Sequence, residues 1–242
     1  MAGSATFSDD IAATTAASAR QTTAVTAPGR TARPWGALGG RSFMVVISGS
    51  RAEFAERGYA AATVARIASR AGVSVQSLYN DWGSKRNLLH AVMEAAVTGD
   101  DDIPMTPGKP PAILTATLTP GEADDPRRLL AHLAREYRLL AERAAVGWQT
   151  YRDGAAMDPD IAADWQEISE MRRAAFRVML AQIPAPALRP GLSPDVAADT
   201  AWAIASPETH RQLVREAGYS YDQLEAWVRT TLSAALFPDE QG

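Results

Sequence analysis

A helix start signal that recurs along the second half of the chain restricts the fold more than any other pattern. A side chain able to cap a first turn stands directly before a proline at Asp125-Pro126, Asp158-Pro159, Ser193-Pro194 and Ser206-Pro207. Asp and Ser side chains accept hydrogen bonds from the free N–H groups of a first turn, and proline fits the first helical position. Ser220 with Gln223 forms a capping box. Apolar residues recur at helical spacing and no run alternates as a strand does, so we predict an all-α fold.

Composition divides the chain into four segments. Residues 1–40 are rich in Ala, Thr, Ser and Gly without a periodic apolar face, and we expect a disordered tail there. Residues 41–97 carry short helical patterns. Residues 98–125 hold five prolines and three glycines, which exclude a continuous helix and indicate a loop. Residues 126–237 follow as a second helical domain.

Within residues 41–97, capping residues and glycines predict four short helices. The predicted boundaries are Gly58 for the end of the first, Thr63 and Gly72 for the second, Ser74 and Trp82 for the third, and Ser84 for the start of the fourth. The small Ala68 permits a close helix crossing, and Gly72 can adopt the positive φ that a three-residue turn needs. Val73 and Leu78 would pack between the two helices. This arrangement is a helix-turn-helix.

The third of these helices presents polar and aromatic residues on its outward side. Val75, Gln76, Ser77 and Tyr79 are of types that contact base edges or phosphates. The net charge of the whole chain is −4, but residues 41–97 carry about +3 and residues 98–242 about −8. A mildly basic segment on an acidic body is compatible with contact to nucleic acid.

Other classes of function find little support. The chain has no cysteine, and its three histidines are far apart in the sequence, so we expect neither a metal site nor a cofactor. No apolar run is long enough for a membrane span. We find no Ser/His/Asp set, no phosphate-binding glycine loop and no helical Glu-x-x-His pair, so we expect no catalytic residues and no enzyme.

The context of the helix-turn-helix resembles the DNA-binding domain of the TetR family of bacterial transcriptional regulators. The residues that carry the resemblance are Phe54 to Tyr59, Thr63, Ala71 to Ser74, Leu78, Tyr79, Trp82, Gly83 to Lys85, Leu88 and Leu89. The stretch from Ala205 to Glu208, with Gly218, Tyr219 and Trp227, is similar to a C-terminal region of many members.

The resemblance implies contacts to double-stranded DNA. Thr63 and Arg66 would face phosphates, and Val75, Gln76 and Ser77 would approach bases in the major groove. Tyr79, Asn80 and Lys85 would contact the DNA backbone.

The resemblance also implies a helical body that binds a small molecule and forms a homodimer in the cytoplasm. The expected function is that of a repressor which binds a palindromic operator and is released by a small apolar effector whose identity the sequence leaves open. Residues 194–206 and 221–236 are the candidates for the dimer interface. The candidate effector contacts are Trp148, Tyr151, Trp165, Met171, Phe176, Met179 and Trp202.

Two departures from the family pattern keep an alternative open. Ser48-Gly49-Ser50 stands where members usually carry two alanines, and such a run weakens a helix. Asp81 stands near the expected phosphate path, where a carboxylate repels. The alternative is a non-enzymatic dimerisation or interaction protein with a degenerate helix-turn-helix.

Overall fold

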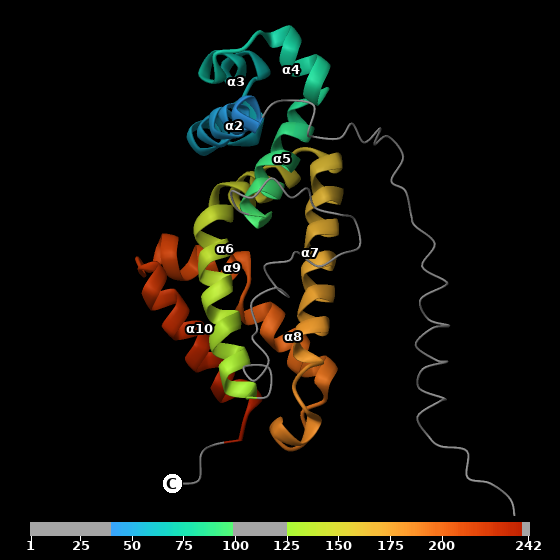
Figure 1. The fold of residues 1–242 in the computed structure, drawn as a ribbon, viewed down its shortest axis with the longest axis vertical. Coiled ribbons are helices and arrows are strands. Elements are labelled where there is room, and N and C mark those ends of the chain that lie inside the picture. Colours follow the sequence, from blue (N-terminus) through green and yellow to red (C-terminus); the bar gives the residue numbers. More distant parts are fainter. Residues whose placement is uncertain (1–39, 99–124, 239–242) are drawn as a thin grey trace, which may run out of the picture. The chain divides into compact units, whose positions relative to one another are not determined.

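The computed structural model describes residues 40–98 and 125–238, and every regular element in these ranges is a helix (Figure 1). The first four are α2 (Gly40–Ala61), α3 (Val64–Ala71), α4 (Val75–Trp82) and α5 (Lys85–Thr98). Those that follow are α6 (Pro126–Ala155), α7 (Pro159–Leu180), η3 (Ala185–Ala187), α8 (Pro194–Ile204), α9 (Pro207–His210), the π-helical turn η4 (Arg211–Glu216) and α10 (Tyr221–Leu236). The all-α prediction is confirmed. The tail expected in residues 1–40 and the loop expected in residues 98–125 lie almost wholly outside the described residues.

The helix starts follow the capping rules. Asp125 accepts a hydrogen bond from the N–H of Arg127 at 2.9 Å, and Asp158 accepts one from Asp160 at 2.9 Å. Ser193 and Ser206 cap α8 and α9 in the same way, and the Ser220–Gln223 capping box is present at the start of α10. Each of these side chains satisfies N–H groups that a first turn leaves free.

Two glycines modify the course of α2. Gly58 has φ 64° and ψ −178°, which interrupts the helical backbone where the sequence predicted an end, although one further turn continues to Ala61. The helix runs unbroken through Ser48-Gly49-Ser50. A Cβ on Gly49 would lie 3.3 Å from the backbone nitrogen of Ala71, so glycine there permits a close approach of α2 to α3.

The long helix α6 is the centre of the packing. It contacts α2, α5, α7, α9 and α10, and Figure 1 shows α6 and α10 side by side. The side chains of Leu130, Tyr151 and Leu224 are among those fully buried in this core. A Cβ on Gly154 of α6 would lie 3.2 Å from the ring of Tyr59, so this glycine lets α2 pack closely on α6.

Within residues 40–98 and 125–238, no helix combines the length and the apolar character that crossing a membrane requires.

Candidate functional site

The α3–α4 pair has the geometry of a helix-turn-helix. Thr63 caps α3 by accepting from the N–H of Arg66 at 3.3 Å. Gly72 then takes left-handed backbone angles of φ 65° and ψ 28°, where residues other than glycine are strained. Ser74 starts α4 by accepting from the N–H of Ser77 at 3.0 Å. The predicted boundaries of both helices are confirmed.

Apolar side chains fix α4 against the rest of this segment. Leu78 and Trp82 are buried, and so are Ile67 and Ala68 of α3. Val73, predicted to pack between the helices with Leu78, is only half-buried. Since Leu78 and Trp82 both point inward, the helical period leaves the opposite face of α4 in solvent.

The exposed face of α4 carries the residues that the sequence singled out for DNA. Val75 is 40% exposed and Tyr79 is 50% exposed, and Gln76, Ser77 and Asn80 are exposed as well. The Gln76 amide donates to the Asn80 side-chain oxygen at 2.9 Å, which aligns the two polar groups along this face. Thr63 and Arg66 are also exposed. These residues are therefore accessible, and their contacts with DNA stay a prediction.

Lys85 has intramolecular partners. Its ammonium donates to the carbonyl oxygens of Tyr59 at 2.6 Å and Ala62 at 3.1 Å, and it lies 4.3 Å from the centroid of the Tyr59 ring. Burial lowers the pKa of Lys85 below its usual range. The predicted contact with DNA backbone stays untested, but here the side chain ties the start of α5 to the end of α2.

A buried carboxylate that sequence reasoning missed connects α2 and α3. The Glu53 side chain is completely buried, and its carboxylate accepts from Nε of Arg70 at 3.0 Å while Arg57 Nε lies 3.5 Å away. Arg70 also pairs with Glu56. Arg57 and Arg70 are thus paired with carboxylates within residues 41–97. Arg66, the other arginine of α3, is exposed and has no ion pair among the described residues.

A second ion-pair cluster joins α5 to α7. Asp164 is buried and accepts two hydrogen bonds from the Arg86 guanidinium, at 2.7 and 2.6 Å. The Nε2 atom of His90 lies 2.9 Å from the same carboxylate. Asp160 contributes a weaker contact with Arg86 at 3.3 Å. The cluster connects the helix that follows the helix-turn-helix with a helix of the body.

The seven candidate effector contacts lie in different surroundings. Tyr151 stacks on Trp165 with centroids 6.0 Å apart, and Trp148 stacks on Tyr137 at 6.4 Å. Phe176 and Met179 are buried on α7, whereas Met171 of the same helix is 41% exposed. The guanidinium carbon of Arg173 lies over the ring of Trp202 on α8, 5.9 Å from the ring centroid. Their role as effector contacts stays a prediction.

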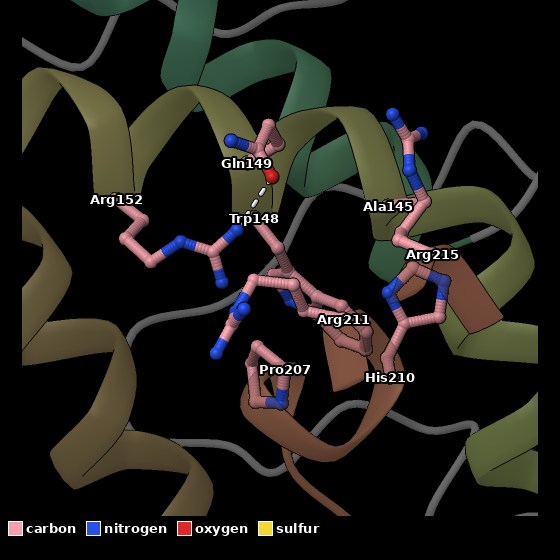
Figure 2. Close-up of a pocket in the computed structure, with 8 residues that line it drawn as sticks. All are labelled: Ala145, Trp148, Gln149, Arg152, Pro207, His210, Arg211 and Arg215. Atoms are coloured by element: carbon pink, nitrogen blue, oxygen red, sulfur yellow. Dashed lines mark hydrogen bonds between the residues drawn. The ribbon is translucent and has the colours of Figure 1, made fainter. Parts of the chain in front are cut away.

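One of the seven, Trp148, lines a small pocket between α6 and the α9–η4 segment (Figure 2). The lining residues are Ala145, Trp148, Gln149, Arg152, Pro207, His210, Arg211 and Arg215. Its volume of about 10 Å³ is close to what one water molecule needs. Burial lowers the pKa of His210 to about 4, helped by the charges of Arg215 and Arg152. No sequence pattern indicated this pocket, because α6 and η4 are far apart in the chain.

Comparison with known proteins places the helix-turn-helix in a family. Residues 46–92 match the sequence profile described as bacterial regulatory proteins of the tetR family. No curated protein sequence matches the chain.

Solved structures are similar to the chain over most of its length. NalD, the secondary repressor of the MexAB-OprM multidrug efflux pump in Pseudomonas aeruginosa, aligns with a TM-score of 0.61 and 17% identity over 82% of this chain and 98% of NalD. The complex of SmeT with triclosan gives 0.62 and 18% over 82% and 93%. The transcriptional regulator FadR from Bacillus subtilis, in complex with stearoyl-CoA, gives 0.56 and 18% over 78% and 97%. At these identities the structures establish a shared fold.

Proposed function

We propose that this chain, a member of the TetR family of bacterial regulators, is a ligand-responsive repressor of transcription that binds a palindromic operator as a homodimer. A small effector with an apolar body releases it from DNA. Its place of action is the cytoplasm, and the proposal involves no catalytic step and no cofactor.

The observation that carries the proposal is the exposed face of α4 behind the left-handed turn at Gly72. α4 is a regular helix of eight residues, Val75–Trp82; an α-helix with its side chains is about 10–12 Å across, which fits the B-DNA major groove of about 12 Å width. Gln76 is suited to paired hydrogen bonds with adenine, and Val75 to contact with a thymine methyl group. Arg66 supplies a cation for a phosphate.

A dimer follows from the small size of this reading surface. One short helix contacts too few base pairs for specific binding, and two half-sites on a symmetric dimer multiply the specificity. The candidate interface, residues 194–206 and 221–236, includes α8 and α10, whose outward sides expose Val196, Ala203, Ala226 and Thr230. These uncharged residues support a role in pairing with a second copy.

Effector control is supported by the ligand complexes among the similar structures and by the link between α5 and α7. SmeT is described in complex with triclosan and FadR with stearoyl-CoA. In this chain, Arg86 and Asp164 join the helix next to the DNA-binding segment to the body. An effector that binds the body better in one position of α5 than in another would shift the spacing of the two α4 helices.

The test begins with selection of genomic DNA fragments by the purified full chain, followed by fluorescence anisotropy on the enriched sequence. We expect a site with two-fold symmetry and an affinity that falls steeply with salt, because phosphate contacts release counterions. A shuffled sequence of the same composition is the control. Equal binding to both, or no binding in a protein that is folded by circular dichroism, would favour the alternative of an interaction protein with a degenerate helix-turn-helix.

A further inference from the structure

We infer that the pocket between α6 and η4 is an anion site that binds an oxyanion group of the effector, held by Arg152, Arg211 and Arg215. The inference rests on the proposed function and adds to it the chemical class of the ligand: an organic acid with an apolar body.

Positively charged side chains are concentrated around the pocket. Arg152 donates to the neutral Gln149 side chain at 2.5 Å, and within the described parts of the chain neither Arg152 nor Arg215 has a carboxylate within ion-pair distance. Arg211 pairs with Glu216. Three arginines thus line one small pocket (Figure 2), and among the described residues Glu216 is the only carboxylate within ion-pair distance of any of them. Guanidinium groups bind carboxylate and phosphate oxygens through paired hydrogen bonds, so an oxyanion would relieve this excess of positive charge.

The indole N–H of Trp148 is a buried hydrogen-bond donor without an acceptor among the described residues. The Trp148 side chain lines the pocket and is only 2% exposed, and its indole N–H has no acceptor within residues 40–98 and 125–238. Buried donors almost always have an acceptor, because leaving one without a partner costs about 1–3 kcal/mol. An oxygen of the ligand would accept a hydrogen bond from this N–H. The other polar side chains that line the pocket, apart from Gln149 and His210, are cations, and they would attract the same oxygen.

The backbone beside the pocket is irregular. Arg211 and Arg215 belong to a π-helical turn, the only one in the described residues, and π-helical turns occur frequently at functional sites. His210, at the junction of α9 and η4, is buried between Trp148 and Tyr221, with ring centroids 5.7 and 5.9 Å away. It is uncharged at neutral pH, because its pKa is about 4. The pocket therefore has an aromatic, uncharged base and a cationic rim.

The size of the pocket restricts what enters it. A volume of about 10 Å³ admits a single oxygen-sized group rather than a whole effector. The charged end of the ligand would bind here, and its apolar part would extend outside the pocket. A carboxylate and a phosphate group share the chemistry that the three arginines recognise.

The experiment measures binding to the full chain by isothermal titration calorimetry at constant ionic strength, with three probes. Sodium octanoate offers a carboxylate on an apolar body, octanamide removes the charge, and inorganic phosphate offers the charge without the body. We expect octanoate to bind at least tenfold more tightly than octanamide. Phosphate binding with a similar dependence on the arginines would assign the site to phosphate groups, and its absence would assign it to organic carboxylates.

Matched variants locate the binding. Arg152→Gln and Arg215→Gln are expected to weaken octanoate binding about tenfold each, since each removes a charge-assisted hydrogen bond. Arg215→Lys keeps the charge and should retain part of the affinity for octanoate. Arg135 is exposed on the same helix α6 as Arg152, and Arg135→Gln should leave the affinity for octanoate unchanged. Equal affinity for octanoate and octanamide, or equal affinity of all four variants, would overturn the anion site.

Operator binding, measured on the same samples without any probe, separates this inference from the proposed function. If the wild-type chain binds its selected DNA and the arginine variants bind octanoate as tightly as the wild type does, the inferred anion site is wrong, while the proposed function as a DNA-binding regulator is supported. If the chain binds no DNA specifically while the arginines still control octanoate binding, the repressor is wrong and the site remains.

Discussion

Asp164 on α7 accepts two hydrogen bonds from the guanidinium of Arg86 on α5, at 2.7 and 2.6 Å, across a gap of 78 residues in the sequence. The carboxylate is almost completely buried, and Arg86 is partly exposed. The two-point geometry fixes the orientation of α5 relative to α7, which a single contact between point charges would not do. It is thus a direct mechanical link between the segment that carries the helix-turn-helix and the body.

Asp164→Asn is expected to lower the free energy of unfolding by roughly 3 kcal/mol, because one partner of a buried ion pair is lost while the other stays in place. Urea unfolding followed by circular dichroism measures this. Asp160→Asn is the matched control, since Asp160 also contacts Arg86 but is 74% exposed, and we expect a loss below about 1 kcal/mol. Similar losses for the two variants would contradict the assigned role of Asp164.

Gln76→Ala and Arg66→Gln should affect DNA binding in different ways. Gln76 would contact a base, so its loss should cost about 1–3 kcal/mol on the selected operator and little on shuffled DNA. Arg66 would contact a phosphate, so its loss should weaken binding to both and reduce the slope of log affinity against log salt by about 0.9 per half-site. Anisotropy titrations at several salt concentrations separate the two effects.

Both residues are exposed, and neither variant should alter stability by more than about 0.5 kcal/mol. A Gln76→Ala protein that binds the operator and shuffled DNA with unchanged relative affinity would remove Gln76 from the reading surface.

Local chemistry was enough to predict the helix boundaries, whereas long-range partners were not predictable. Asp125, Ser74 and Gly72 act on residues a few positions away, so their roles can be read from the sequence. The burial of Glu53 depends on Arg70, 17 residues further on, and that of Asp164 on Arg86. Periodicity predicts that a face is buried, but it does not say which charged residue on a neighbouring helix will meet it.

Of the candidate sites, the DNA-binding face could be predicted from the sequence and the pocket could not. The exposed face of α4 follows from one short helix with a known inner side, and the structure agrees with the sequence there. The pocket of Arg152, His210 and Arg215 requires α9 and η4 to pack beside α6, which no local pattern encodes. Of the seven candidate effector contacts, Trp148 lines this pocket, and the role of the other six stays a prediction.

Lys85→Met tests whether this lysine supports the fold or binds DNA. Its ammonium donates to the carbonyls of Tyr59 and Ala62, so we expect the variant to lose about 2 kcal/mol of stability. The salt slope of DNA binding should remain unchanged at a temperature where the variant is folded. Unchanged stability together with a slope reduced by about 0.9 would instead assign Lys85 to a phosphate.

Stability in acid should depend on His210. Its pKa is about 4 in the folded chain, against 6.5 for an ordinary histidine, mainly because of burial and further because of Arg215 and Arg152. The unfolded chain therefore takes up a proton between pH 6.5 and about pH 4 that the folded chain refuses, and stability falls as the pH falls through this window. A loss of up to about 3 kcal/mol follows from the size of the shift.

His210→Gln should flatten this part of the profile, measured as the free energy of unfolding in urea from pH 7 to pH 4.5, while other acid-sensitive groups affect both proteins alike. The ring lies against Trp148 of α6 and within 3.4 Å of the Tyr221 hydroxyl of α10, so the variant should be less stable at pH 7. An oxyanion bound by Arg152 and Arg215 would offset their charges and raise the pKa of His210. Between pH 7 and about pH 5.5, where octanoate stays mostly ionised, saturating octanoate should therefore reduce the acid sensitivity of the wild type and leave that of His210→Gln unchanged; parallel profiles with and without octanoate in this range would contradict the placement of the anion beside this ring.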